Sequence, residues 1–277
     1  MATDIVDYET IDSVLAVIDG PRPKNSGSSS EREGRGMSWD LECGWDGAYK
    51  AYTGGWAEGA ARAYELADTL APKPRASRTT LERSVVGMFP NVAAHLAGAP
   101  NSMYRVTQKN AQGRPYVHLY TPIGFSAMVD ANGAFNKGCA MVALIDALEN
   151  AGCRVKVTAL VCSMHSGTRV TYRFMLKDYS DRLDIDQLIF TVAHPAFFRR
   201  IVFGLYERSA DKYVRDSTRM GYGKTVDIVE ADCPVDNREV LVILPRMTWD
   251  DNSKDSATFL QEMVEMLPED IRTEIEG

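Results

Sequence analysis

The stretch from Pro115 to Glu207 constrains the fold of this chain more than any other. A β-rich run at Tyr116–Tyr120 is followed by Phe135–Glu149, in which apolar side chains recur at helical spacing. The next run, Val155–Val161, is rich in β-branched residues and alternates in the manner of a strand. Two strands joined by a helix can pair in parallel, and such βαβ units are right-handed in nearly all proteins. The sequence therefore predicts a βαβ unit here.

The residues after this unit extend the predicted sheet. Arg169–Leu176 alternates as a strand, and a turn at Gly167 separates it from the strand before it, so we expect an antiparallel pair in a mixed sheet. A buried strand at Glu239–Leu244 and a helix at Ser256–Leu267 follow. The alternation of helices and strands predicts a three-layer α/β fold over residues 111–277.

The chain before residue 111 is expected to form helical appendages. Amphipathic spacing over Tyr8–Ile18 predicts a helical arm in residues 1–20, and the Gly-, Ser- and charge-rich residues 21–37 predict a flexible linker. Residues 38–110 are expected to form a helical subdomain with helices at Asp46–Tyr52 and Trp56–Leu70. Tryptophans at this density anchor a subdomain or form a partner surface; they are Trp39, Trp45 and Trp56.

Charge and hydropathy limit the classes of partner. The 277 residues carry a net charge of -7, whereas a general nucleic-acid binder usually has a basic face. Apolar runs stay well short of the roughly 20 residues that cross a bilayer. We therefore expect a cytoplasmic protein without membrane contact, with the virion as the alternative location. Short basic clusters keep nucleic acid open as a partner, namely Arg75, Arg78, Arg83, Arg199 and Arg200.

Catalytic motifs have no positive support in the sequence. The four histidines form no zinc-binding spacing, and no G-x-S-x-G elbow occurs. The five cysteines lack C-x-x-C spacing and are expected to be buried, reduced thiols. We expect a non-enzymatic protein without a cofactor. A magnesium-dependent enzyme is the alternative, because oxygen-rich loops follow several strands and bind hard cations; the candidate ligands are Asp130, Asp178 and Asp250.

The central stretch resembles the von Willebrand factor A class. In that class a hydrophobic strand leads into a D-x-S-x-S loop, and an amphipathic helix and a second strand follow. The resemblance implies a von Willebrand A-like fold whose metal-ion-dependent adhesion site is degenerate, because the motif itself is lost here. Thr121, Ile123 and Phe125 stand at its positions, and Ser126 and Asp130 lie nearby.

Three further stretches resemble a group of uncharacterised proteins from phages and mobile elements: Gly55–Gly59, Phe89–Tyr104 and Leu183–Arg200. Together, the resemblances imply an interaction or adaptor protein whose partner is a MoxR-type ATPase or a phage assembly component. A nucleic-acid-associated factor in phage replication or transcription is the alternative. His165, in a Ser/Gly turn, is expected at the surface. The candidate partner contacts are Trp39, Trp45, Trp56, Ser126, Asp130 and His165.

Overall fold

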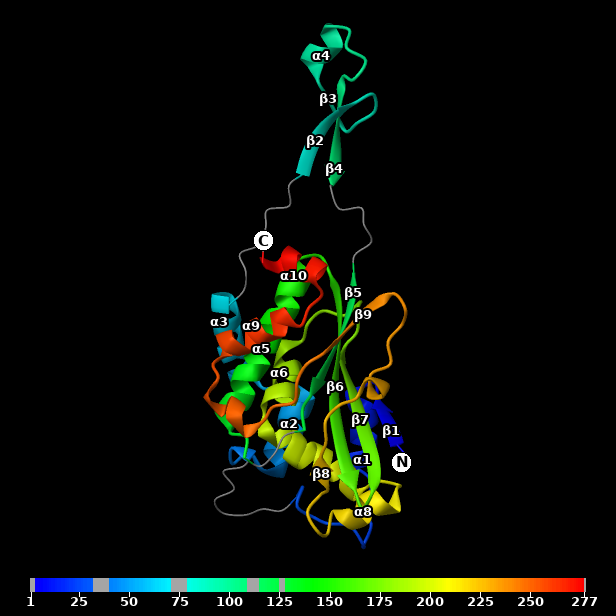
Figure 1. Ribbon diagram of the computed structural model, residues 1–277, viewed down its shortest axis with the longest axis vertical. Coiled ribbons are helices and arrows are strands. Elements are labelled where there is room, and N and C mark those ends of the chain that lie inside the picture. The colour runs from blue at the N-terminus through cyan, green and yellow to red at the C-terminus, as the bar shows by residue number, and fades with distance from the viewer. Residues whose placement is uncertain (1–2, 32–39, 71–78, 109–114, 125–127, 277) are drawn as a thin grey trace. The chain divides into compact units, whose positions relative to one another are not determined.

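A computed structural model describes residues 3–31, 40–70, 79–108, 115–124 and 128–276 (Figure 1). The chain divides into two compact units. The main unit comprises Met1–Pro72 and Pro115–Gly277, and the small unit comprises Lys73–Arg114. The predicted division into an arm, a linker, a helical subdomain over 38–110 and an α/β domain is therefore not the division observed.

The main unit is built on the predicted βαβ unit. Strands β5 (Tyr116–Pro122) and β6 (Arg154–His165) pair in parallel, and α5 (Ala131–Asn150) connects them. Strand β7 (Thr168–Lys177) pairs antiparallel with β6, which confirms the mixed sheet. Strand β9 (Glu239–Ile243) adds in parallel to β5 at one edge, and the strand order is β1-β7-β6-β5-β9. The short β8 (Lys224–Thr225) pairs with β6 off this path.

Helix α5 is the centre of the helical layer. Asp130 caps its N-terminus by accepting the Gly133 N–H at 2.6 Å, and Gly152 ends the turn after it with φ of +94°. Gly138 allows α5 and α6 to approach closely, because a Cβ there would lie 2.5 Å from the Ala193 Cβ. The helices packed around α5 are α3 (Ala57–Leu70), α6 (Ile185–Ala193), α9 (Ser256–Glu265) and α10 (Glu269–Glu276).

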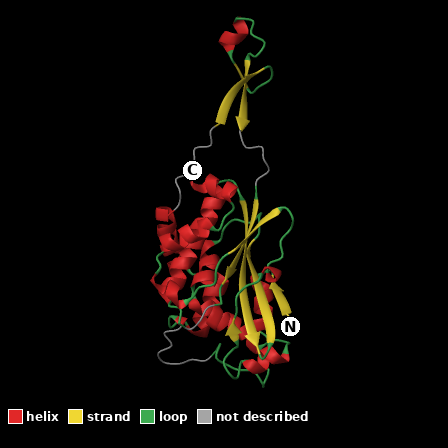
Figure 2. Cartoon of the chain, in the orientation of Figure 1, coloured by secondary structure: helices red, strands yellow, loops and turns green. Residues whose placement is uncertain are grey.

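Within the described residues the helical layer covers one face of the sheet (Figures 1 and 2). The other face is covered in part by residues 226–238, where Cys233 and Ile228 pack on Tyr120 and Leu160. The expected three-layer arrangement is thus replaced by a helical layer, a sheet and a loop. The physical reason is that the outer side chains of the strands are largely polar and offer a helix little apolar surface.

The N-terminal residues are part of the main sheet. β1 (Thr3–Tyr8) pairs in parallel with β7 and forms the sheet edge, and α1 (Ile11–Ile18) follows it. The predicted arm was therefore wrong, because Tyr8 stacks on Phe174 in the core at 5.2 Å between ring centroids. The described part of the predicted linker is also fixed, since Ser30 is buried and bonds to Glu207. Residues 32–37 lie outside the described residues.

The two predicted helices after the linker are confirmed as α2 (Gly44–Gly54) and α3, but they belong to the main unit. Trp56 packs edge-on against Phe135 of α5 at 5.8 Å and against His194 at 4.6 Å. The Trp45 ring lies against Gly204, because a Cβ added at Gly204 would be 3.3 Å from the ring. These two tryptophans therefore fasten α2 and α3 to the helical layer.

The helices after β7 are short. A π-helical turn, η2 (Phe197–Val202), continues into α7 (Phe203–Glu207), and α8 is Lys212–Ser217. No single helix of the described residues meets the length and hydropathy criteria for a membrane span, although the bent pair Ile185–Ala193 and Phe197–Glu207, at 70°, meets them jointly. The expected reduced cysteines are confirmed, with Cys43 half-buried and the other four buried.

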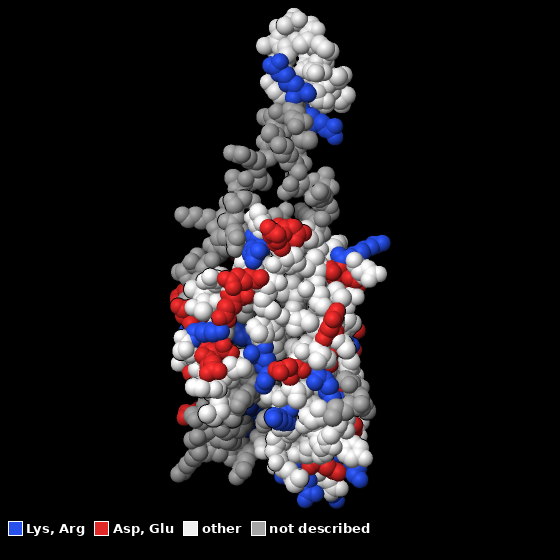
Figure 3. All heavy atoms as spheres, viewed as in Figure 1, with Lys and Arg blue, Asp and Glu red and all other residues white. Residues whose placement is uncertain are grey.

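The small unit is a β structure, which corrects the predicted helical subdomain. Its sheet has the order β2-β4-β3, with a short helix after β3. Ala94 is the one buried residue among its described side chains, so the unit lacks a core of its own. In Figure 3 the end of the unit that carries the helix is white, and Lys and Arg atoms lie beside the strands. The elements are β2 (Thr79–Ser84), β3 (Phe89–Pro90), α4 (Val92–Leu96) and β4 (Met103–Gln108).

Candidate functional site

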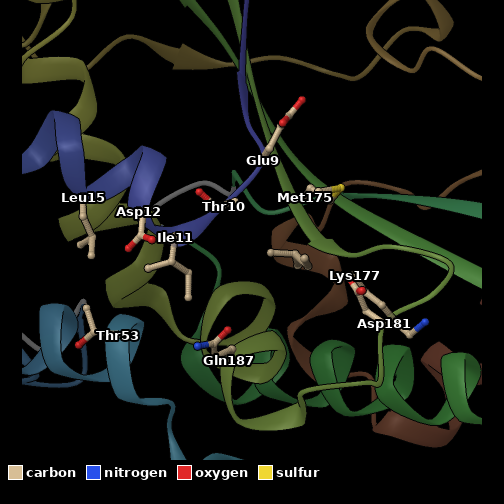
Figure 4. A pocket seen from close by; sticks show the side chains of 11 residues that line it. Glu9, Thr10, Ile11, Asp12, Leu15, Thr53, Met175, Lys177, Asp181 and Gln187 are labelled. Carbon is tan, nitrogen blue, oxygen red and sulfur yellow. The ribbon is translucent and has the colours of Figure 1, made fainter.

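A cavity of about 490 Å³ opens where β1 turns into α1 (Figure 4). This volume lies in the range that holds a small ligand or several side chains. Residues from four elements and the loop after β7 line it, and in Figure 4 the α1 side chains face Thr53 and Gln187. The lining residues are Glu9, Thr10, Ile11, Asp12, Leu15, Thr53, Met175, Leu176, Lys177, Asp181 and Gln187.

The β1–α1 junction positions the cavity wall. Thr10 caps α1, accepting the Ser13 N–H at 3.2 Å, and the Ser13 hydroxyl accepts the Thr10 N–H at 3.3 Å. This reciprocal cap fixes the start of the helix. Ile11 and Leu15, four residues apart, therefore share a helix face and form an apolar side of the cavity.

The cavity is acidic. Glu9 and Asp12 have no hydrogen bond or ion pair within the described part of the chain, and Asp181 accepts the Asp178 N–H at 3.0 Å. Lys177 does not balance these carboxylates, because its Nζ is 2.7 Å from the Glu149 carboxylate and its side chain is 1% exposed. A ligand would therefore meet negative charge beside apolar surface.

A second cavity, of about 210 Å³, lies on the outer face of the sheet and shares Glu9 and Met175 with the first. We call the two cavities together the acidic groove. Five strands contribute to the second cavity. On the three neighbouring strands β5, β6 and β7, the polar side chains that line the cavity point to the same face because strand residues alternate. These side chains are His118, Tyr120, Lys156, Thr158 and Arg173, with Asp7 and Glu239 beside them.

His118 is neutral in this cavity. Burial lowers the pKa of His118 to about 4, although Glu239 opposes the shift. Its Nε2 lies 2.9 Å from the Thr158 hydroxyl, and its Nδ1 lies 3.5 Å from the Glu239 carboxylate. The Tyr120 ring stacks on it at 4.1 Å, and the Tyr120 hydroxyl donates to the Pro234 carbonyl at 2.6 Å. These bonds hold the cavity floor rigid.

The two cations of the second cavity are neutralised within the chain. Arg173 donates two hydrogen bonds to Asp7, one of them 2.6 Å long from Nη2. Lys156 lies 3.5 Å from the Asp178 carboxylate. The excess negative charge of the acidic groove therefore comes from Glu9, Asp12, Asp181 and Glu239, and the groove suits a cationic, partly apolar ligand.

The structure does not bring the predicted partner contacts together into one surface. Trp39 and Ser126 lie outside the described residues, and Trp45 and Trp56 pack within the main unit. Asp130 serves as the α5 cap, and its own N–H donates to Asn252 at 3.0 Å. His165 is fully buried, which corrects the expectation of an exposed turn residue.

His165 belongs to a buried hydrogen-bond chain. Its Nε2 lies 2.7 Å from the Ser163 hydroxyl and its Nδ1 lies 2.5 Å from the Ser217 hydroxyl. The Tyr206 hydroxyl is 2.8 Å from that of Ser163. Burial lowers the pKa of His165 to about 4. This hydrogen-bonded group resembles a set of catalytic hydroxyls. Because Ser163 is buried as well, we assign the group to the core.

The predicted basic clusters divide into three groups. Arg75 and Arg78 lie outside the described residues, and Arg83 is exposed on the small unit. Arg199 and Arg200 are buried in the π-helical turn, where Arg200 donates to the Ser30 carbonyl at 2.9 Å. Arg200 pairs with Asp40 at 2.6 Å. The expectation that Arg199 and Arg200 contact nucleic acid was therefore wrong.

The candidate magnesium ligands are not assembled. Within the described residues no group of three His, Cys, Asp or Glu side chains is placed to hold a metal ion. Thr121 and Ile123, at the positions of the lost motif, are buried under the helical layer.

Residues 6–270 match the family model described as "Domain of unknown function (DUF7192)". The chain belongs to this family. No curated protein and no solved structure matches it. The matched range of residues 6–270 includes residues of both units.

Sequence reasoning missed the acidic groove. Glu9 and Asp12 lie in one short segment, but Met175 and Asp181 come from far along the chain. The sequence also contains a signal for an exposed surface on the small unit. Three of the four residues from Val85 to Met88 are large and apolar, and none of the four is charged. This pattern is that of an exposed contact loop in a unit too small to bury it.

Proposed function

We propose that this DUF7192 protein is an interaction or adaptor protein that holds a basic, partly apolar segment of a protein partner in the acidic groove. The observation that carries the proposal is the pair of carboxylates, Glu9 and Asp12, that lack partners within the described residues beside the apolar side of a 490 Å³ cavity. A Lys- or Arg-containing segment satisfies both halves of such a site.

The proposed partner is a MoxR-type ATPase or a phage assembly component, as the resemblances imply. Support for a von Willebrand A-like sheet and central helix, with a loop in place of the second helical layer, comes from the parallel β5–α5–β6 unit and from the antiparallel β7 after it. We infer that its metal site is degenerate, because Thr121 and Ile123 replace motif residues. Binding at the groove, without catalysis, is then the role of the main unit.

Photo-crosslinking in the host cell tests this proposal. A crosslinking amino acid replaces Thr53, which lines the groove and is exposed, and the adduct is identified by mass spectrometry. We expect one defined protein adduct whose yield falls about tenfold with Asp12→Lys, because a like charge then faces the partner's cation. Glu65→Lys, an equal charge change on exposed surface of α3, is the matched control. An adduct insensitive to Asp12→Lys contradicts the proposal.

The alternative function, a nucleic-acid-associated factor in phage replication or transcription, has one supporting observation. Residues 73–114 contain seven Lys and Arg and one Glu, a net charge of +6. The rest of the chain then carries -13, since the total is -7. Single-stranded DNA binding that weakens steeply with salt would support this alternative. Binding that is independent of salt, or absent, would exclude it.

A further inference from the structure

The small unit carries a compact set of exposed apolar side chains, which we call the apolar tip. Six large apolar residues within twelve positions are each 55–81% exposed. A unit with one buried described residue cannot cover them itself, and exposed apolar surface at this density marks a contact with another phase or molecule. The apolar tip consists of Val85, Val86, Met88, Phe89, Val92 and Leu96.

The apolar tip has a defined shape. The Met88 N–H donates to the Tyr104 carbonyl at 2.9 Å, and the Asn91 N–H donates to the Ser102 carbonyl at 2.7 Å. Asn91 also caps α4 by accepting the Ala94 N–H at 3.1 Å. Val92 and Leu96, four residues apart, share one face of α4. The tip is therefore presented on a hydrogen-bonded scaffold.

Cations lie on the strands behind the apolar tip. Arg83 is one residue before the end of β2 and is in register with Phe89 through Tyr104, and Arg105 lies roughly 7 Å along β4 from its end at the tip. Arg83 is opposite Tyr104 and Arg105 is opposite Glu82, which places the two arginines on opposite faces of the small sheet. The tip is thus followed by positive charge on both sides.

This order of groups matches a bilayer surface. We propose that the apolar tip inserts into the interface of an anionic phospholipid bilayer, with Arg83 and Arg105 at the level of the lipid phosphates. The inference goes beyond the proposed function, which uses the main unit. It departs from the expectation of no membrane contact, which rested on the lack of a spanning segment and not on the surface of the small unit.

Two alternatives fit the groups less well. Nucleic acid needs cations at the contact itself, and residues 85–102 contain no Lys or Arg. A groove on a protein would match charge on one side, whereas these arginines occupy both faces. Glu82, opposite Arg105, is the one acidic residue in 73–114, so the stretch from Arg83 to Arg114 itself adds no repulsion to an anionic lipid layer.

Vesicle flotation with the full-length chain tests the proposal. We expect the chain to float with vesicles of phosphatidylcholine and phosphatidylglycerol and much less with phosphatidylcholine alone. Val86→Asp should lower the partition coefficient roughly tenfold or more, because it places a charge at a position where the wild-type side chain would be buried in the lipid layer. Arg83→Glu should have an effect of similar size that shrinks at high salt. These two side chains are exposed, so neither change threatens folding.

Matched controls sit on the main unit. Met220→Asp and Arg219→Glu alter side chains that are also exposed, and they should leave flotation unchanged. As a direct readout, Met88→Trp adds fluorescence that brominated acyl chains should quench beyond the wild-type level. The proposal is overturned if wild type does not bind anionic vesicles, or if Val86→Asp floats like wild type. It is equally overturned if Val86→Asp instead abolishes self-association or binding to single-stranded DNA without affecting flotation.

Discussion

The buried ion pair between Asp40 and Arg200 should be among the most costly interactions to break in this protein. The Asp40 Oδ2 accepts from Arg200 Nε at 2.7 Å and from Nη2 at 2.6 Å, and both side chains are at most 2% exposed. Arg200 also donates to the Ser30 carbonyl at 2.9 Å. Asp40→Ala leaves a buried guanidinium without its carboxylate, which costs about 3–5 kcal/mol.

Urea unfolding followed by circular dichroism measures this loss. Asp227→Ala is the matched control, because it breaks the exposed pair with Arg246, 2.9 Å long, and should cost less than about 1 kcal/mol. The double variant Asp40→Ala/Arg200→Met should be more stable than Asp40→Ala, since it removes both charges from the core. A loss below about 1 kcal/mol for Asp40→Ala would refute this reasoning, because the arginine would then be hydrated.

Three more outcomes follow from the packing. Burial lowers the pKa of three histidines to about 4, so each favours the folded state when neutral. These histidines are His118, His165 and His194. The free energy of unfolding is unaffected by them above pH 6.5 and falls by up to about 1.4 kcal/mol per pH unit and per histidine toward pH 4, because the unfolded state then binds more protons. Urea unfolding at pH 7 and at pH 5 measures this loss. Gly138→Ala should destabilise by about 1–3 kcal/mol in the same assay, because its Cβ meets Ala193, whereas Gly54→Ala meets no atom within 4 Å and should be neutral. Glu207→Gln should speed tryptic cleavage at Lys24, because the buried carboxylate accepts from Ser30 at 2.9 Å, and unchanged cleavage would show that residues 21–31 are held without it.

Local patterns were sufficient to predict the central elements. β5, α5, β6 and β7 follow from alternation, helical spacing and the turn at Gly167, since each signal lies within one segment. The antiparallel pairing of β6 and β7 was also predictable, because two residues of turn allow no other pairing. Asp130 and Asp184 stand at the starts of α5 and α6 and accept backbone N–H groups there, which is the position that Asp favours in helices.

The failed predictions involve segments whose structure depends on distant residues. The residues around Ser30 predict a flexible linker, but the Ser30 hydroxyl bonds to the distant Glu207. Arg200 was expected to be a surface cation, but it pairs with the distant Asp40. The first residues read as an arm because β1 is an edge strand with one neighbour, β7, more than 160 positions away. The residue pattern of one strand does not show which distant segment pairs with it.

The sequence alone determined the β-helix-β centre, the reduced cysteines and the uneven distribution of charge between residues 73–114 and the rest of the chain. Tertiary structure decided which polar residues are reachable: it buried His165, Arg199 and Arg200 and exposed Val86 and Leu96. The reason is that hydrogen-bond geometry within an element is local, whereas burial depends on which elements pack together. A site made of Glu9, Met175 and Asp181 exists only after that packing.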